Sequence, residues 1–134
     1  RIVGPFRRHT IYALCNAVGT GDFPEAAGIL RYLLDSEKNR ETFYVYSLAA
    51  HVMKIAEYHA QVRAGIPRDD AEKTASGTQF LWKLNRMDEQ ARNFAKPETI
   101  RRVLDVLAET DSALKKSVVD KGLIVEFMLP KVMP

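Results

Sequence analysis

The sequence of 134 residues predicts an all-α protein, a single compact domain of about six to seven helices. Apolar residues recur at spacings of three and four along nearly the whole chain, from Ile11 to Met128. No segment shows the sustained alternation of apolar and polar residues that is typical of a half-buried strand. The length fits one domain. We therefore expect a linker over residues 1–7 and a helical domain over residues 8–134.

The first two helices are separated by a short glycine-containing turn. The first helix has one apolar stripe, formed by Ile11, Leu14, Cys15 and Val18. Gly19-Thr20-Gly21 should end it, because glycine favours the conformation that follows a helix. Asp22 is a suitable N-cap for the second helix, with Pro24 near its first position and Glu25 three residues after the cap. Its apolar stripe consists of Ala26, Ile29, Leu30, Leu33 and Leu34.

The third helix should be the longest, over residues 41–64. Aromatic side chains at Phe43, Tyr44 and Tyr46 widen its apolar face, so that it is apolar on more than one side. A helix of this kind usually lies in the centre of a domain and is contacted by several neighbours. Gly65 and Pro67 should end it.

The second half of the chain predicts three or four more helices. A short helix should follow Asp69 and end near residues 76–77, and another should carry its apolar residues from Phe80 to Phe94. Pro97 marks the start of the next, whose apolar residues include Ile100, Val103, Leu104, Leu107 and Leu114. Asp120 and Gly122 indicate a further turn before the last helix, and Pro130 should kink or end that helix.

Composition excludes several classes of protein. With 46% hydrophobic and 28% charged residues, the chain can bury a core and is not expected to be disordered. A single cysteine excludes a disulfide framework and a cysteine-rich zinc site. No apolar segment approaches the roughly 20 residues that a membrane span needs, and no signal-peptide pattern is present. We expect a cytoplasmic protein without a membrane partner.

The sequence contains no recognisable motif for catalysis, metal binding or cofactor binding. Gly19-Thr20-Gly21 lacks the following lysine and hydroxyl residue of a phosphate-binding loop. His51 and His59 share a helix face without a suitably spaced carboxylate, so we expect core or surface histidines rather than metal ligands. Cys15 lies on an apolar stripe and is expected to be a buried structural thiol. We therefore expect no catalytic, metal-binding or cofactor-binding residue.

Asp111 is a carboxylate in an apolar pattern. The pattern of its helix steps through Ile100, Leu104, Leu107, Asp111 and Leu114. A buried carboxylate requires a partner, and Lys115 lies one turn later on the same face. We expect Asp111 to be at least half buried and bonded to Lys115 or to a backbone N–H. The alternative is that the helix is rotated about its axis and leaves Asp111 half exposed.

An ordered set of segments over residues 8–133 resembles the C-terminal domain of the bacterial DNA polymerase III delta subunit. The matching segments are residues 11–34, residues 48–55, Gln90-Ala91-Arg92 with the following Phe94, residues 111–115 (an Asp-x-x-Leu-Lys pattern) and Glu126. Two positions depart from the family pattern: no proline precedes Phe80, and Pro130 interrupts the last helix.

The resemblance implies a role in DNA replication. Delta is one subunit of the clamp loader, the pentamer that opens a ring-shaped sliding clamp and places it on primed DNA. The domain would be an all-helical collar element that contacts the other clamp-loader subunits, whereas the parent protein would meet the sliding clamp and primed DNA. It would contain no ATP site. The resemblance also adds Glu126 to Asp111 and Lys115 as a structural, buried polar residue.

Two sets of residues are candidates for contacts at the surface. Apolar side chains beyond the needs of the core are candidates for a subunit interface, and these are Tyr44, Tyr46, Trp82 and Phe127. The alternative function is direct binding of nucleic acid through basic clusters, formed by Arg7, Arg8, Arg101, Arg102, Lys115, Lys116 and Lys121. The net charge of +3, with both signs interspersed, does not decide between the two.

Overall fold

The computed structural model describes residues 10–76, 87–117 and 120–134. Over these residues the chain forms seven α-helices and no strand, which confirms the predicted all-α fold. The helices are α2 (Ile11–Gly19), α3 (Phe23–Ser36), α4 (Glu41–Arg63), α5 (Arg68–Ser76), α7 (Met87–Asn93), α8 (Pro97–Lys116) and α9 (Lys121–Val132).

Side-chain caps explain where several helices begin. The Thr10 hydroxyl accepts a hydrogen bond from the Ala13 N–H at 3.1 Å and opens α2. Asp22 accepts from the Glu25 N–H at 3.1 Å and opens α3, as its position in the sequence predicts. Satisfying these N–H groups stabilises each first turn, because they have no partner within the helix.

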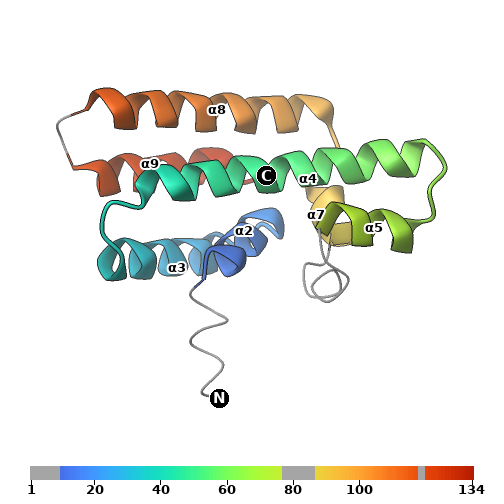
Figure 1. Ribbon diagram of the computed structural model, residues 1–134, viewed down its shortest axis with the longest axis horizontal. Coiled ribbons are helices and arrows are strands. Elements are labelled where there is room, and N and C mark those ends of the chain that lie inside the picture. Colours follow the sequence, from blue (N-terminus) through green and yellow to red (C-terminus); the bar gives the residue numbers. More distant parts are fainter. Residues whose placement is uncertain (1–9, 77–86, 118–119) are drawn as a thin grey trace, which may run out of the picture.

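The helices form three layers, with α4 in the middle. Figure 1 shows α8 on one side of α4, α9 beside α4, and α2 and α3 on the other side. Helices α5 and α7 pack against the C-terminal half of α4. The prediction that α4 is the central helix is confirmed, because it contacts α2, α5, α7, α8 and α9.

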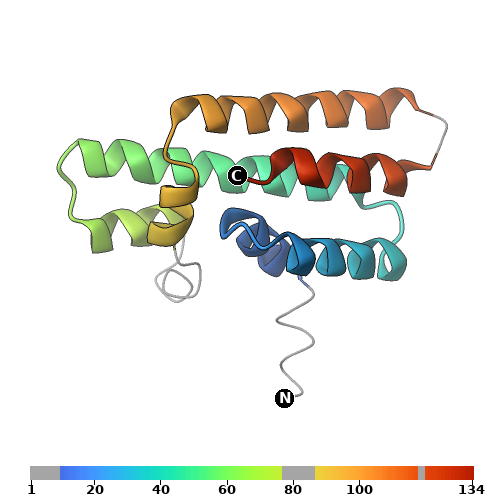
Figure 2. The same ribbon diagram turned by 180° about the vertical axis from the view of Figure 1, so that it is seen from behind.

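The C-terminal segment returns to the middle of the molecule. Seen from behind in Figure 2, α9 runs antiparallel to α8, and its end lies near the turn between α2 and α3. Arg102 of α8 donates hydrogen bonds to the carbonyls of Lys131 (2.5 Å) and Met133 (3.3 Å) and thereby holds the end of α9. Pro130 does not end α9, which continues to Val132.

Candidate functional site

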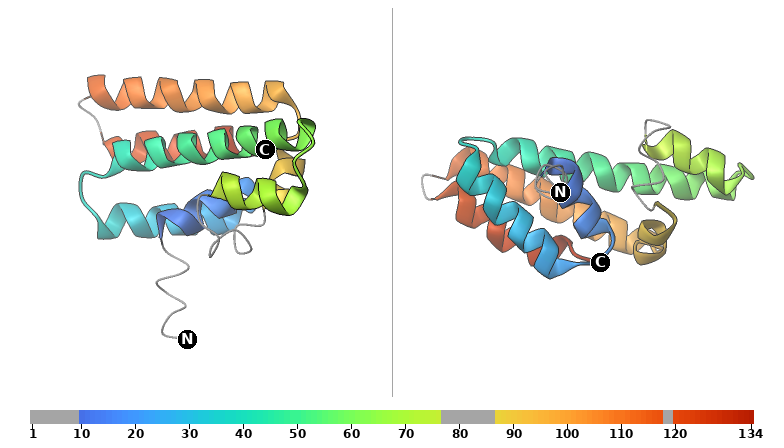
Figure 3. Two further views of the ribbon diagram at one scale, coloured as in Figure 1. Left: turned by 45° about the vertical axis from the view of Figure 1, so that its right-hand side comes forward. Right: turned by 90° about the horizontal axis from the view of Figure 1, so that it is seen from below.

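Four aromatic side chains on α2, α3 and α4 are exposed on one part of the molecule, which we call the aromatic surface. They are Tyr12, Tyr32, Phe43 and Tyr46, and their exposed fractions are 64%, 49%, 40% and 70%. The right-hand view of Figure 3 shows α2 and α3 on the same side of α4, and the four residues belong to α2, α3 and the N-terminal half of α4. Apolar surface of this extent is not needed for the core of the domain.

The aromatic surface contains two hollows that share a wall. A hollow of about 640 Å³ lies between α2, α3 and α4, with Tyr12, Tyr32 and Phe43 in its lining. A second, of about 250 Å³, is lined by Tyr12, Phe43 and Tyr46 and reaches the side chains of Cys15 and His51. Because Tyr12 and Phe43 line both hollows, the surface is continuous.

Tyr44 lines the larger hollow, but it is not one of the exposed aromatic residues, so its prediction as an apolar side chain beyond the needs of the core is wrong. Its side chain is 1% exposed and lies in the core. The single hydroxyl proton is shared between a Glu37 carboxylate oxygen at 2.5 Å and the Leu33 carbonyl at 3.2 Å. Burial, followed by the bond to Glu37, raises the pKa of Tyr44. The phenol therefore stays neutral and connects α4 to the end of α3.

The other predicted interface residues lie in different places. Tyr46 is exposed within the aromatic surface, and Phe127 is exposed on α9 beside Leu123, outside both hollows. Trp82 lies outside the described residues.

The sequence pattern did not single out Tyr12, Tyr32 and Phe43 as exposed aromatic residues. Tyr12 and Tyr32 lie off the apolar stripes of their helices, and that displacement is the signal that could have identified them.

Of the two polar residues of α8 that were predicted to be buried, Asp111 meets the prediction and Lys115 does not. The buried side of this helix is formed by Val103, Leu107, Thr110 and Leu114. Asp111 lies at the edge of this side, with 34% of its side chain exposed, and its Oδ2 is 3.0 Å from the Lys115 Nζ. Lys115 is 69% exposed, so it is not a buried residue. Asp111 is therefore more than half buried and bonded to Lys115, as predicted, and the pair bridges one turn of the helix.

Glu126 forms an ion pair between helices. Its Oε2 lies 2.6 Å from the Nε of Arg31, which joins α9 to α3. The Glu126 side chain is 26% exposed, and Arg31 is open to solvent. Glu126 therefore lies at the edge of the helix contact rather than within the core.

A buried polar network centres on Gln90. The sequence pattern did not predict that this side chain is buried. Gln90 in α7 is fully buried. Its Oε1 lies 2.5 Å from the His51 Nε2, and its Nε2 donates to the Asn16 side-chain oxygen at 3.1 Å. Asn93 donates to the Gly19 carbonyl at 3.0 Å. These bonds connect α7 to α4 and α2, and burial lowers the pKa of His51.

The remaining residues with reactive side chains have structural surroundings. The Nε2 of His59 lies 3.0 Å from the carbonyls of both Ala91 and Phe94. Burial raises the pKa of the Cys15 thiol to about 12, which keeps it protonated. Among the described residues, no three His, Cys, Asp or Glu side chains are grouped so as to hold a metal ion. No helix in the same part of the chain is long and apolar enough to span a membrane.

The basic residues predicted to lie near nucleic acid do not form one cluster within the described residues. Arg101, Arg102, Lys116 and Lys121 are exposed, but Arg102 is bonded to the end of α9, and Lys115 pairs with Asp111. Asp105 and Glu109 lie on α8 between the two arginines and the two lysines. Arg7 and Arg8 lie outside the residues that the structure describes.

Comparison with known proteins gives one family. No curated protein and no solved structure matches this chain. The family described as "DNA polymerase III delta subunit, C-terminal domain" matches residues 8–132, which is nearly the whole chain. Together with the all-α fold, this match shows that the chain belongs to the family of C-terminal domains of the DNA polymerase III delta subunit.

Proposed function

We propose that this domain holds the delta subunit in the clamp loader by contacting neighbouring subunits, and that the aromatic surface makes one of these contacts. The observation that carries the proposal is the exposure of Tyr12, Tyr32, Phe43 and Tyr46 around two adjoining hollows. Membership of a family of DNA polymerase III subunit domains supports a role in a replication complex. Within such a complex, a surface of this kind supplies the free energy of assembly.

The chemistry of the surface suits a protein partner. Interface cores are enriched in Tyr and Phe, and their affinity is concentrated in a few aromatic residues that fill pockets. Charged groups lie at the edge: the Arg40 guanidinium is 4.2 Å from the centre of the Phe43 ring, and Lys54 lines the smaller hollow. An apolar centre with a charged edge is the usual arrangement of a specific interface.

The wider role follows from the same proposal. The domain serves as a collar element, while the parent protein meets the sliding clamp and primed DNA. The complex acts on chromosomal DNA, so the proposed location is the cytoplasm. The domain itself contributes contacts between subunits and no catalytic step.

Deletion of the domain tests the assembly role. The full-length subunit, with and without residues 8–133, is mixed with its partner subunits, and the pentamer is measured by native mass spectrometry. The shortened subunit should lose stable incorporation while its remaining part still binds the clamp. Equal incorporation of both forms would show that assembly does not depend on this domain.

A pair of substitutions tests the aromatic surface separately. Tyr12→Ser with Tyr46→Ser removes two exposed rings without touching the core, and should weaken incorporation at least about tenfold, the usual effect of losing central aromatic contacts. Phe127→Ser is the matched control, because this ring is equally exposed (69%) but lies outside both hollows. If the control weakens assembly as much as the double variant does, the interface lies elsewhere.

The alternative of direct nucleic-acid binding makes a different prediction. A direct binder would retain duplex or single-stranded DNA with an affinity that falls steeply with salt. The described basic residues are interspersed with acidic ones on α8, so no observation favours this function. The isolated domain should therefore not retain DNA in a salt titration.

A further inference from the structure

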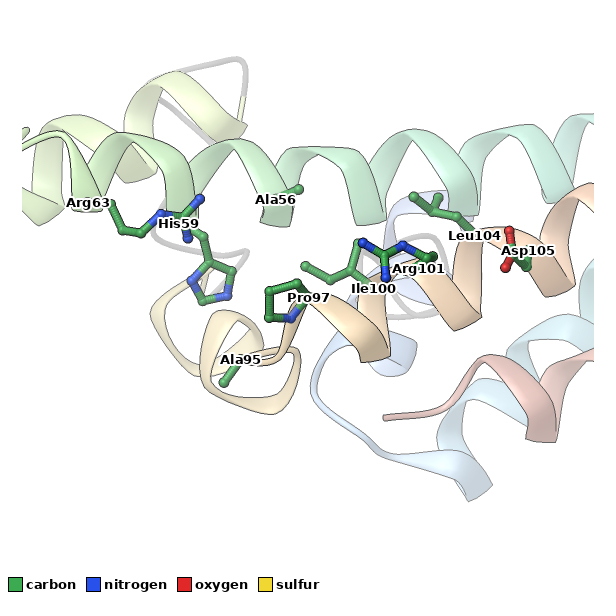
Figure 4. A pocket seen from close by; sticks show the side chains of 9 residues that line it. All are labelled: Ala56, His59, Arg63, Ala95, Pro97, Ile100, Arg101, Leu104 and Asp105. Carbon is green, nitrogen blue, oxygen red and sulfur yellow. The ribbon is translucent and has the colours of Figure 1, made fainter.

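A groove between α4 and α8 is separate from the aromatic surface. It has a volume of about 360 Å³ and lies where the C-terminal half of α4 passes the first turns of α8. Figure 4 shows the nine side chains that line it: Ala56, His59, Arg63, Ala95, Pro97, Ile100, Arg101, Leu104 and Asp105. The groove shares no residue with the two hollows of the aromatic surface.

Small side chains explain why the groove exists. Ala56 on α4 and Ala95 before α8 present only a methyl group where larger residues would fill the space. Pro97 starts α8 next to Ala95, and its ring forms part of the wall. Ile100 and Leu104 complete an apolar floor.

Two arginines and one aspartate line the groove, and they lie at different points along its length. In Figure 4, Arg63 lies at one end beside His59, Arg101 lies near the middle, and Asp105 lies at the other end. Neither arginine forms an ion pair with any residue that the structure describes, and Asp105 forms none there either. His59 has its Nε2 directed to two backbone carbonyls and forms part of the wall. The end near Arg63 and Arg101 is therefore complementary to an anion.

We propose that this groove binds a segment of a partner protein in which an apolar side chain lies next to one or more carboxylates. The apolar side chain would lie over Ile100 and Leu104, and the carboxylates would meet Arg63 and Arg101. Arginine suits this role because its planar guanidinium forms paired hydrogen bonds with a carboxylate. A volume of about 360 Å³ accommodates one or two large side chains.

The floor of the groove argues for a peptide rather than for nucleic acid. Single-stranded nucleic acid is usually held by aromatic rings on which the bases stack, combined with a basic channel. The groove contains no Phe, Tyr or Trp among the described residues that line it, and its floor consists of aliphatic side chains and proline. A phosphate chain would gain nothing from such a floor, whereas an aliphatic or aromatic side chain of a protein would be desolvated there.

The test uses the 134-residue chain and three pools of octapeptides. The first pool has Glu-Asp flanked by Leu, Ile, Phe or Met. The second pool removes the negative charge by replacing Glu-Asp with Gln-Asn. The third pool removes the apolar side chains by replacing them with Ser. Binding is followed by NMR through the methyl groups of Ile100 and Leu104. Only the first pool should shift these signals strongly, and the affinity should fall with added salt.

Charge reversal identifies the arginines as the acidic contact. Arg63→Glu with Arg101→Glu should weaken binding of the first pool about tenfold or more and should favour a pool with Lys-Arg in place of Glu-Asp. The control is Lys116→Glu with Lys121→Glu, which reverses two exposed charges outside the groove and should bind as the parent chain does. If the reversed groove variant does not fold, as judged by circular dichroism, Arg63→Gln with Arg101→Gln replaces it.

Several results would overturn the proposal. The first is equal binding of the acidic and amide pools, and the second is an absence of shifts at Ile100 and Leu104 with every pool. A ten-residue oligothymidine that binds the groove as tightly as the acidic pool would indicate nucleic acid instead. None of these results depends on the aromatic surface, so this proposal and the assembly proposal can fail independently.

Discussion

Gly19 lies where α2 meets α7, directly against the side chain of Gln90. A Cβ atom at residue 19 would lie 1.9 Å from the Gln90 Oε1 and 2.5 Å from its Cδ. Gln90 cannot move aside freely, because it is buried and bonded to His51 and Asn16. Gly19→Ala should therefore lower the free energy of unfolding by about 1–3 kcal/mol in urea denaturation.

Gly28 provides the matched control within the same domain. It lies in the middle of α3, and an added Cβ would meet nothing within 4 Å. Gly28→Ala should raise the free energy of unfolding by about 0.5–1 kcal/mol, since alanine has the better helix propensity. Equal effects of the two substitutions would contradict the tight contact at Gly19.

His51 should make the stability of the domain depend on pH. Burial lowers its pKa below the ordinary value of 6.5; the hydrogen bond to Gln90 opposes this shift, and the charge of Lys54 adds to it. As the pH falls below 6.5, the unfolded chain binds a proton that the folded chain does not. The free energy of unfolding should then fall by up to about 1.4 kcal/mol per pH unit until His51 titrates in the folded state.

The comparison with His51→Gln isolates this contribution. Urea denaturation of both chains between about pH 7.5 and 5 should show a shallower dependence for the variant, which has no imidazole at this position. Parallel pH profiles would mean that His51 gains its proton equally easily in the folded and unfolded states.

Asp111 should contribute little to stability despite its place in an apolar pattern. Its partner Lys115 is exposed, and the pair is an i,i+4 contact at the helix surface. Pairs of this type are worth about 0.2–0.5 kcal/mol. Asp111→Ala should shift the free energy of unfolding by less than about 0.5 kcal/mol, and a loss above about 1 kcal/mol in urea would indicate that the carboxylate makes more than a surface ion pair.

At the scale of single elements, the end of α9 depends on α8. Arg102 bonds to the carbonyls of Lys131 and Met133, which have no partner further along the helix. Arg102→Ala should lower the free energy of unfolding by about 1 kcal/mol, because bonds from a charged donor are lost at an exposed site. Hydrogen exchange should become faster in the last turn of α9.

Arg101→Ala is the control for this element. Arg101 is adjacent to Arg102 on α8, and it bonds to no carbonyl within the described residues. Its removal should leave hydrogen exchange in α9 unchanged, with an effect on stability within about 0.5 kcal/mol. Faster exchange in both variants would mean that the general charge of α8, and not the two bonds, stabilises the end of α9.

At the scale of the whole molecule, the domain should unfold in one step. One core cluster includes residues from Leu14 in α2 to Val132 in α9, and α4 packs against α2, α5, α7, α8 and α9. No helix can leave without exposing part of this shared core, which is the condition for two-state unfolding. Far-ultraviolet circular dichroism and the near-ultraviolet signal of tyrosine should give coincident urea transitions, whereas separated midpoints would reveal parts of the fold that unfold independently.

The starts of several helices could be predicted from the sequence, because caps and prolines act on residues next to them in the chain. Asp22 and Pro97 mark the starts of α3 and α8 because a cap and a proline act on their own first turn, whatever the rest of the molecule does. The order of segments from residue 8 to residue 132 also identifies the family. These properties depend on neighbours in the chain, which the sequence displays directly.

The orientation of each helix about its axis depended on tertiary contacts. The apolar residues of α8 cover a wide arc, so periodicity alone is compatible with burial of Asp111 or of Thr110, and packing against α4 and α9 buried Thr110. Tyr44 can be buried because Leu33 and Glu37, from the preceding helix and turn, accept hydrogen bonds from its hydroxyl. The sequence by itself determined where the helices lie and to which family they belong; only the tertiary structure decided which side chains are left at the surface, because that depends on partners distant in the chain.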